Sequence, residues 1–155
     1  MKKIILALLC LFMVSASLFA DMTRSELQQM YLTFFRGNGI TALIDNDGDI
    51  QFEYAGKYID SWTYYIIVDE TDQQYFNISS FVISLDTAQE KMQAPFAASM
   101  ATRDAFVAKI YLDSTGNYVI ASAETFLVSP RDFEAVFFKL MDGMEEAIVE
   151  FVENM

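Results

Sequence analysis

The sequence predicts an α+β domain: a single antiparallel β-sheet of about five to six strands with helices packed on it, in the order α-ββββ-α-ββ-α. Two observations predict this fold. Apolar runs at 106–112 and 118–128, rich in β-branched and aromatic residues, flank a polar turn and are typical of an antiparallel hairpin. Apolar residues then recur at 3.6-residue spacing from Phe133 to Val152, which predicts a long helix that must bury one side against the sheet.

The first twenty residues have the layout of a secretory signal peptide. Lys2 and Lys3 form a basic start, residues 4–14 form an apolar core, and small residues lead to Ala20. We expect cleavage after Ala20, leaving residues 21–155 as a single domain that is periplasmic or secreted and free of the membrane. An uncleaved anchor is the alternative, and it is disfavoured because the apolar run is shorter than the ~20 residues that span a bilayer.

The first half of the mature chain is predicted to hold one helix and a run of strands. Thr23 and Glu26 have the spacing of a capping box, and Gly37 to Gly39 can end a helix, so a helix is predicted over 24–36. Polar turns separate the apolar segments that follow, which predicts an antiparallel meander of strands at 40–44, 50–54, 58–69 and 75–85.

The second half is predicted to hold a helix, the hairpin and the long final helix. Thr87 and Glu90 can cap a helix over 87–102, in which Pro95 predicts a kink or a split near residues 93–94. Ser129 and Pro130 mark the start of the final helix. Its predicted apolar stripe comprises Phe133, Val136, Phe137, Leu140, Met141, Met144, Ile148, Phe151 and Val152.

Composition excludes several classes of chemistry. The only cysteine, Cys10, lies in the predicted signal peptide, and the sequence contains no histidine. The mature chain would therefore lack disulfides, thiol catalysis, histidine bases and Cys/His zinc sites. We expect no enzymatic activity, no cofactor and no metal site, with an enzyme built on carboxylates alone as the least favoured reading.

Two acidic features of the sequence could have a chemical role. The segment DNDGD at 45–49 resembles part of a calcium loop, but glycine stands at its fourth position instead of its sixth, and Gly56 occupies the twelfth position, where glutamate is required. A hairpin turn that uses Gly48 is the favoured interpretation. Glu124 lies inside an apolar strand, so it either faces a solvated side of the sheet or is a partly buried acid with a raised pKa.

Charge limits the class of partner. Removing Lys2 and Lys3 from the 10 basic residues leaves 8 against 22 acidic residues, a net charge of −14. Such a chain repels phosphate backbones and anionic lipid, so nucleic-acid and membrane-surface binding are disfavoured.

The apolar pattern points instead to a protein partner. Tyr65 and Ile67 lie on the strand face opposite Tyr64 and Ile66, so both faces of the sheet need cover, either from the first two helices or from another subunit. On the last helix, Phe138 lies beside the main stripe, which fits either a broad core-facing side or an interface. We predict a protein partner or a homodimer, with the candidate contact residues Tyr65, Ile67, Phe138 and Met141.

Four segments resemble the YbjN family: 47–54 (DGDIQFEY), 66–70 (IIVDE), 107–113 (VAKIYLD) and 121–127 (ASAETFL). Members are described as candidate bacterial sensory transduction regulators, and their fold is similar to that of type III secretion chaperones, which are often dimeric. The resemblance covers residues 45–151 and implies no cofactor and no catalytic residues. Extra length at 59–62 and Pro95 depart from the family pattern.

These features together predict an exported, non-catalytic YbjN-like protein. It would be a protein-binding, chaperone-like or regulatory module acting through its sheet and C-terminal helix. The alternative is a periplasmic carrier of a small apolar ligand or lipid, with the aromatic layer between sheet and helix as its pocket.

Overall fold

The computed structural model describes residues 22–155, and the predicted signal peptide lies outside them. Six strands form one antiparallel sheet in the order β1-β2-β3-β4-β6-β5. The strands are β1 Ala42–Ile44, β2 Ile50–Tyr54, β3 Trp62–Ile66, β4 Tyr75–Ser84, β5 Ala108–Leu112 and β6 Tyr118–Phe126. The helices are α2 Arg24–Gly37, α3 Ala88–Asp104, the short 3₁₀ helix η2 Pro130–Asp132, and α4 Phe133–Asn154. The predicted α+β class and element order are confirmed.

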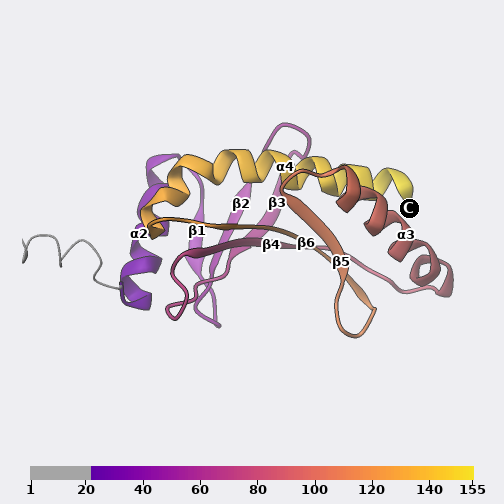
Figure 1. Cartoon of the computed structure of the whole chain (residues 1–155), viewed down its shortest axis with the longest axis horizontal. Coiled ribbons are helices and arrows are strands. Elements are labelled where there is room, and N and C mark those ends of the chain that lie inside the picture. Colours follow the sequence, from indigo (N-terminus) through magenta and orange to yellow (C-terminus); the bar gives the residue numbers. More distant parts are fainter. Residues whose placement is uncertain (1–21) are drawn as a thin grey trace, which may run out of the picture.

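Helix α4 runs along the sheet, with α2 near one end and α3 near the other (Figure 1). The core lies between α4 and the sheet. Phe137 of α4 is fully buried there, with its ring centroid 5.3 Å from that of Phe35 on α2 and 5.7 Å from that of Phe52 on β2. Within residues 22–155, no helix is both long and apolar enough to cross a bilayer.

The predicted helix starts are confirmed by their caps. At α2, the Glu26 amide donates to the Thr23 hydroxyl, and the Thr23 amide donates to the Glu26 carboxylate at 2.7 Å. The same reciprocal pair joins Thr87 and Glu90 at the start of α3. These bonds satisfy backbone donors that the first turn of a helix leaves free, so each cap fixes where its helix begins.

The structure corrects three predictions, which concern β3, α3 and the apolar stripe of α4. Strand β3 is shorter than the predicted 58–69 at both ends. The Tyr58 amide donates to the Glu145 carboxylate on α4, and the Val68 amide donates to the Asp49 carboxylate, so neither pairs with a neighbouring strand. Helix α3 runs through Pro95 without the predicted split, since buried alanines on both sides of Pro95 hold the helix against the core. Val152 is 59% exposed, because it lies about 100° around α4 from the buried Phe151, at the margin of the stripe.

Candidate functional site: the open face of the sheet

All three long helices pack on the same face of the sheet. The Phe35 ring of α2 stacks on Phe52 with centroids 4.6 Å apart, and Phe137 of α4 contacts the same ring. Helix α3 lies over β5, where the Thr102 hydroxyl bonds to both the amide and the carbonyl of Ile110. The sequence left open whether the first two helices cover the second face. They do not, and no helix of residues 22–155 does.

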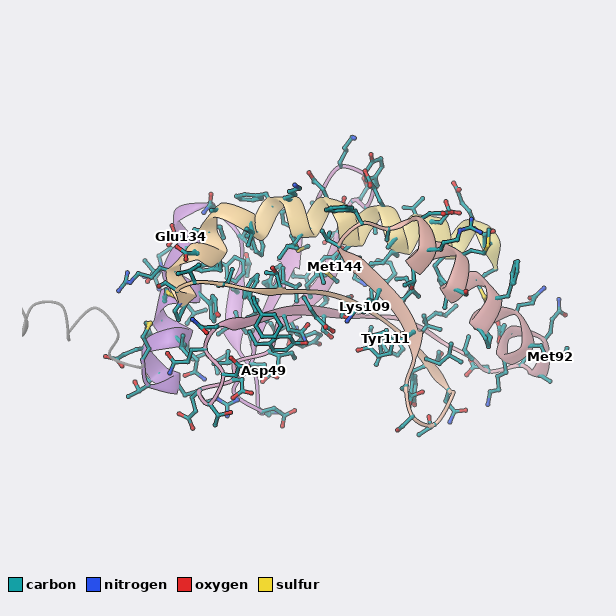
Figure 2. All side chains as sticks on the ribbon, in the orientation of Figure 1. Asp49, Met92, Lys109, Tyr111, Glu134 and Met144 are labelled. Carbon is teal, nitrogen blue, oxygen red and sulfur yellow. The ribbon has the colours of Figure 1, made fainter. Side chains whose placement is uncertain are left out.

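We call the uncovered side the open face. Strand register places on it the residues that alternate with the core positions. Figure 2 shows Tyr111 on the side of the sheet away from α4 and Met144 on the side that α4 covers. The open face comprises Leu43, Gln51, Glu53, Thr63, Tyr65, Ile67, Tyr75, Asn77, Ser79, Phe81, Lys109, Tyr111, Tyr118, Ile120, Ser122, Glu124 and Phe126.

Large apolar and aromatic side chains dominate the open face. Phe81 of β4 and Tyr118 of β6 pack with ring centroids 5.5 Å apart, and Tyr75 and Phe126 form a second cross-strand pair at the same separation. Such pairs stabilise neighbouring strands, but they leave much of each ring in water. Phe126 remains 75% exposed.

A small polar cluster interrupts this apolar surface. Lys109 Nζ lies 2.7 Å from Glu124 Oε2, and the Ser122 hydroxyl donates to the other Glu124 oxygen at 3.1 Å. The hydrogen bond from Lys109 is the main reason that the pKa of Glu124 is lowered. Burial, helped by contact with Glu124, raises the pKa of Tyr75 to about 12. Glu124 therefore faces the solvated side of the sheet, and the alternative of a raised pKa is wrong.

The open face is nearly neutral in a strongly acidic protein. Its only charged side chains are Glu53, Glu124 and Lys109, and the last two neutralise each other. Most of the net charge of −14 in residues 21–155 therefore lies elsewhere.

The four candidate contact residues fall in three places. Tyr65 and Ile67 lie two residues apart on the open face, where Ile67 is 37% exposed. Phe138 is 42% exposed but lies on α4, with its ring against Phe34 and Tyr54 on the helix side. Met141 is fully buried between α4 and the sheet, so its assignment to a partner surface is corrected.

Several open-face residues were not among the candidates. Phe81, Tyr111, Tyr118 and Phe126 are all more exposed than Ile67. The period-two pattern of β6 was the available signal, because it places apolar residues on both of its faces. Alternation alone does not show which of the two faces the helices leave uncovered.

The space between sheet and helices is filled, not hollow. Phe52 and Tyr64 are buried with ring centroids 5.6 Å apart, and Phe137 packs over Phe52. A groove of about 690 Å³ lies elsewhere, between α2 and the start of α4, and its lining includes Met30 and Arg131. It does not lie in the aromatic layer that a carrier of an apolar ligand was expected to use.

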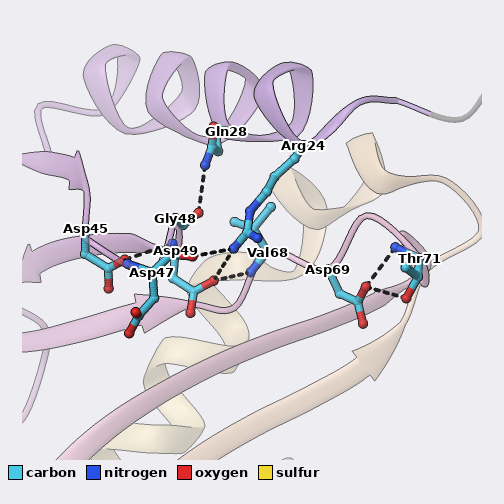
Figure 3. Close-up of polar contacts among 9 residues, drawn as sticks. All are labelled: Arg24, Gln28, Asp45, Asp47, Gly48, Asp49, Val68, Asp69 and Thr71. Carbon is cyan, nitrogen blue, oxygen red and sulfur yellow. Dashed lines mark hydrogen bonds and ion pairs between the residues drawn. The ribbon is translucent and has the colours of Figure 1, made fainter.

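In the turn at 45–49, two of the carboxylates accept hydrogen bonds from backbone amides (Figure 3). Asp45 Oδ1 accepts from the amides of Asp47 and Asp49, both at 2.9 Å, while Asp49 Oδ1 accepts from the Val68 amide at 2.8 Å. Arg24 reaches the turn from α2, and its Nη2 lies 3.6 Å from Asp49 Oδ1. Gly48 has φ +87°, which confirms the predicted turn. In residues 22–155, no group of three or more His, Cys, Asp or Glu side chains could hold a metal ion.

Comparisons with known proteins support the fold. No protein-family model and no curated protein sequence matches the chain. The structure of YbjN from E. coli is similar, with 10% sequence identity and a TM-score of 0.56 over 79% of this chain and 88% of YbjN. A protein from Methanothermobacter thermautotrophicus matches with 12% identity and a TM-score of 0.51 over 82% of this chain and 97% of its own. The ExsC–ExsE complex matches more loosely, with 14% identity and a TM-score of 0.41 over 81% of this chain and 92% of the matched chain. The chain therefore has a YbjN-like fold.

Proposed function

We propose that this protein is an exported, non-catalytic protein-binding module that acts through the open face of its sheet. The observation that carries the proposal is the exposed aromatic surface formed by Phe81, Tyr111, Tyr118 and Phe126. Phe81 and Tyr118 form one exposed apolar cluster, and Phe126 with Tyr75 forms another. Apolar clusters that a soluble protein leaves in water often mark interaction sites. Aromatic residues are also enriched at the centres of protein interfaces.

The filled core favours this function over carriage of a lipid or small apolar ligand. Sites for such ligands are concave and apolar, with room for most of the ligand surface. Here the layer between sheet and α4 is occupied by closely packed rings such as Phe52 and Phe137. The apolar surface that remains is on the outside of the sheet.

We propose a second copy of the chain as the occupant of the open face. Two antiparallel sheets can pack face to face about 10 Å apart, with interdigitating side chains, and a twofold axis makes such a contact self-complementary. Charge decides which surface is suitable, because most of this acidic chain would repel a copy of itself. The open face carries only Glu53 as an unbalanced charge, so it allows close approach where other surfaces do not.

Sedimentation of residues 21–155 at low and high salt tests the proposal. We expect a dimer that tightens as salt screens the repulsion between the two acidic copies. Phe126→Lys and Tyr118→Lys each place a charge in the apolar contact and should weaken the dimer at least tenfold, a cost of about 1.4 kcal/mol.

Val152→Lys is the matched control, because Val152 is exposed and apolar but lies on α4, away from the open face. It should leave the dimer intact. A monomer at high protein concentration in both buffers would reject the second copy as occupant. Equal weakening by Val152→Lys would show that the open face is not the contact.

A further inference from the structure

The connection between β2 and β3, residues 55–61, rises alongside α4 (Figure 1), and we call it the strap. Tyr58 makes its contacts with the helix. The Tyr58 amide donates to Glu145 Oε2 at 3.0 Å, and the Tyr58 hydroxyl donates to Glu146 Oε1 at 3.0 Å. Lys57 Nζ donates to the same hydroxyl at 2.6 Å. The polar bonds of the strap to α4 are thus made at one residue, and Ile59 adds a partly buried apolar contact with the core.

Glu145 is an unusual anchor for the strap. It is completely buried, and its Oε1 atom has no hydrogen-bond partner. Backbone of the strap covers it so closely that a Cβ added to Gly56 would collide with the carboxylate. None of the ion pairs in residues 22–155 includes Glu145. Burying a carboxyl group that has no cationic partner and one oxygen without a hydrogen bond costs more than burying a fully paired one.

The other groups near Glu145 do not supply the missing charge. Tyr64 is buried and its hydroxyl also lacks a partner. Burial, together with the charge of Glu145, raises the pKa of Tyr64 above its usual range, so the phenol stays neutral. Burial also raises the pKa of Tyr54, and the charges of Glu145 and Asp142 add to that effect. The strap therefore closes over a carboxyl group that has no cationic partner among the ion pairs of residues 22–155.

We propose that the strap is a releasable cover over α4, and that hydration of the Glu145 carboxyl group favours its release. Opening breaks the bonds of Tyr58 to the helix but returns water to Glu145, so the two effects partly offset each other. Phe52 and Ile66, by contrast, are buried apolar residues of the sheet core and gain nothing from an opening of the strap. The strap should open while the sheet stays folded, and this motion is independent of what the open face binds.

Native-state hydrogen exchange at low denaturant tests the proposal on the mature protein. Local openings exchange without denaturant dependence, whereas core amides exchange through global unfolding. We expect exchange of the Tyr58 amide to be independent of denaturant, and exchange of the β4 amides to occur through global unfolding. Trp62, the only tryptophan of the chain, lies directly after the strap and gives a fluorescence readout of the same motion.

The variant Glu145→Gln keeps the shape of the side chain and removes its ability to ionise. Glutamine keeps an oxygen that can accept from the Tyr58 amide but cannot ionise when water reaches it, so opening gains less hydration free energy and the strap should open less often. We expect exchange at Tyr58 to slow about tenfold, since an amide gains less free energy from hydration than a carboxyl group that can ionise in water. Glu153→Gln, an exposed charge change on the same helix, should leave the exchange unaltered. Unchanged or faster exchange in Glu145→Gln, or exchange at Tyr58 only through global unfolding in the wild type, would overturn the proposal.

Discussion

Replacing Phe137 by alanine should remove a central contact of the core. Its side chain is fully buried, and its ring centroid lies 5.2 Å from Phe34, 5.3 Å from Phe35 and 5.7 Å from Phe52. Truncating a buried phenylalanine costs about 3–5 kcal/mol through lost transfer free energy and the cavity that remains. Small domains are stable by only about 5–15 kcal/mol, so Phe137→Ala should remove a large share of the free energy of unfolding.

Phe138→Ala is the matched control, because it makes the same change one residue further along α4. Phe138 is 42% exposed, so its truncation should cost about 1 kcal/mol, since the transfer term scales with the apolar area that is buried. Urea unfolding of both variants, followed by circular dichroism, gives the two free energies. Similar losses in the two variants, or a loss below about 1 kcal/mol for Phe137→Ala, would refute this account of the core.

Three further predictions concern export, calcium and pH. Expressed in a Gram-negative host, the chain should reach the periplasm with Asp21 as its first residue, as N-terminal sequencing would show, and a soluble product that keeps Met1 would contradict this. Millimolar calcium should raise the melting temperature no more than magnesium does, because the carboxylates of Asp45 and Asp49 already accept hydrogen bonds from backbone amides. A hydrogen bond from the Thr115 hydroxyl is the largest of the effects that lower the pKa of Asp113 to about 2. Asp113→Asn should therefore lower the urea midpoint at pH values above about 3.9, the pKa of an aspartate in an unfolded chain. The difference in urea midpoint between variant and wild type should shrink as the pH falls towards about 2, where Asp113 becomes protonated in the folded protein too. A deficit that is the same at pH 7 and pH 2 would contradict this last prediction.

The sequence determined those parts of the fold that depend on neighbouring residues. Thr23 with Glu26, and Thr87 with Glu90, mark helix starts because each pair closes its hydrogen bonds within one turn. Gly48 marks a turn because its positive φ is a local requirement. Element type and order followed from such signals and from hydrophobic periodicity, which the packing of the sheet and helices then confirmed.

Only the tertiary structure decided which surfaces are buried. Strand alternation shows that Tyr65 and Tyr64 lie on opposite faces, but not that all helices pack on the Tyr64 side. Helical spacing places Met141 and Phe138 on neighbouring parts of α4, yet the sheet buries the first and leaves the second partly in water. Glu145 is buried by a strap distant in sequence, and the same contact makes β3 begin later than predicted. Burial depends on which distant segments meet, and a periodic pattern along one segment carries no information about its partner. The open face, and with it the candidate site, exists because the three helices share one side of the sheet.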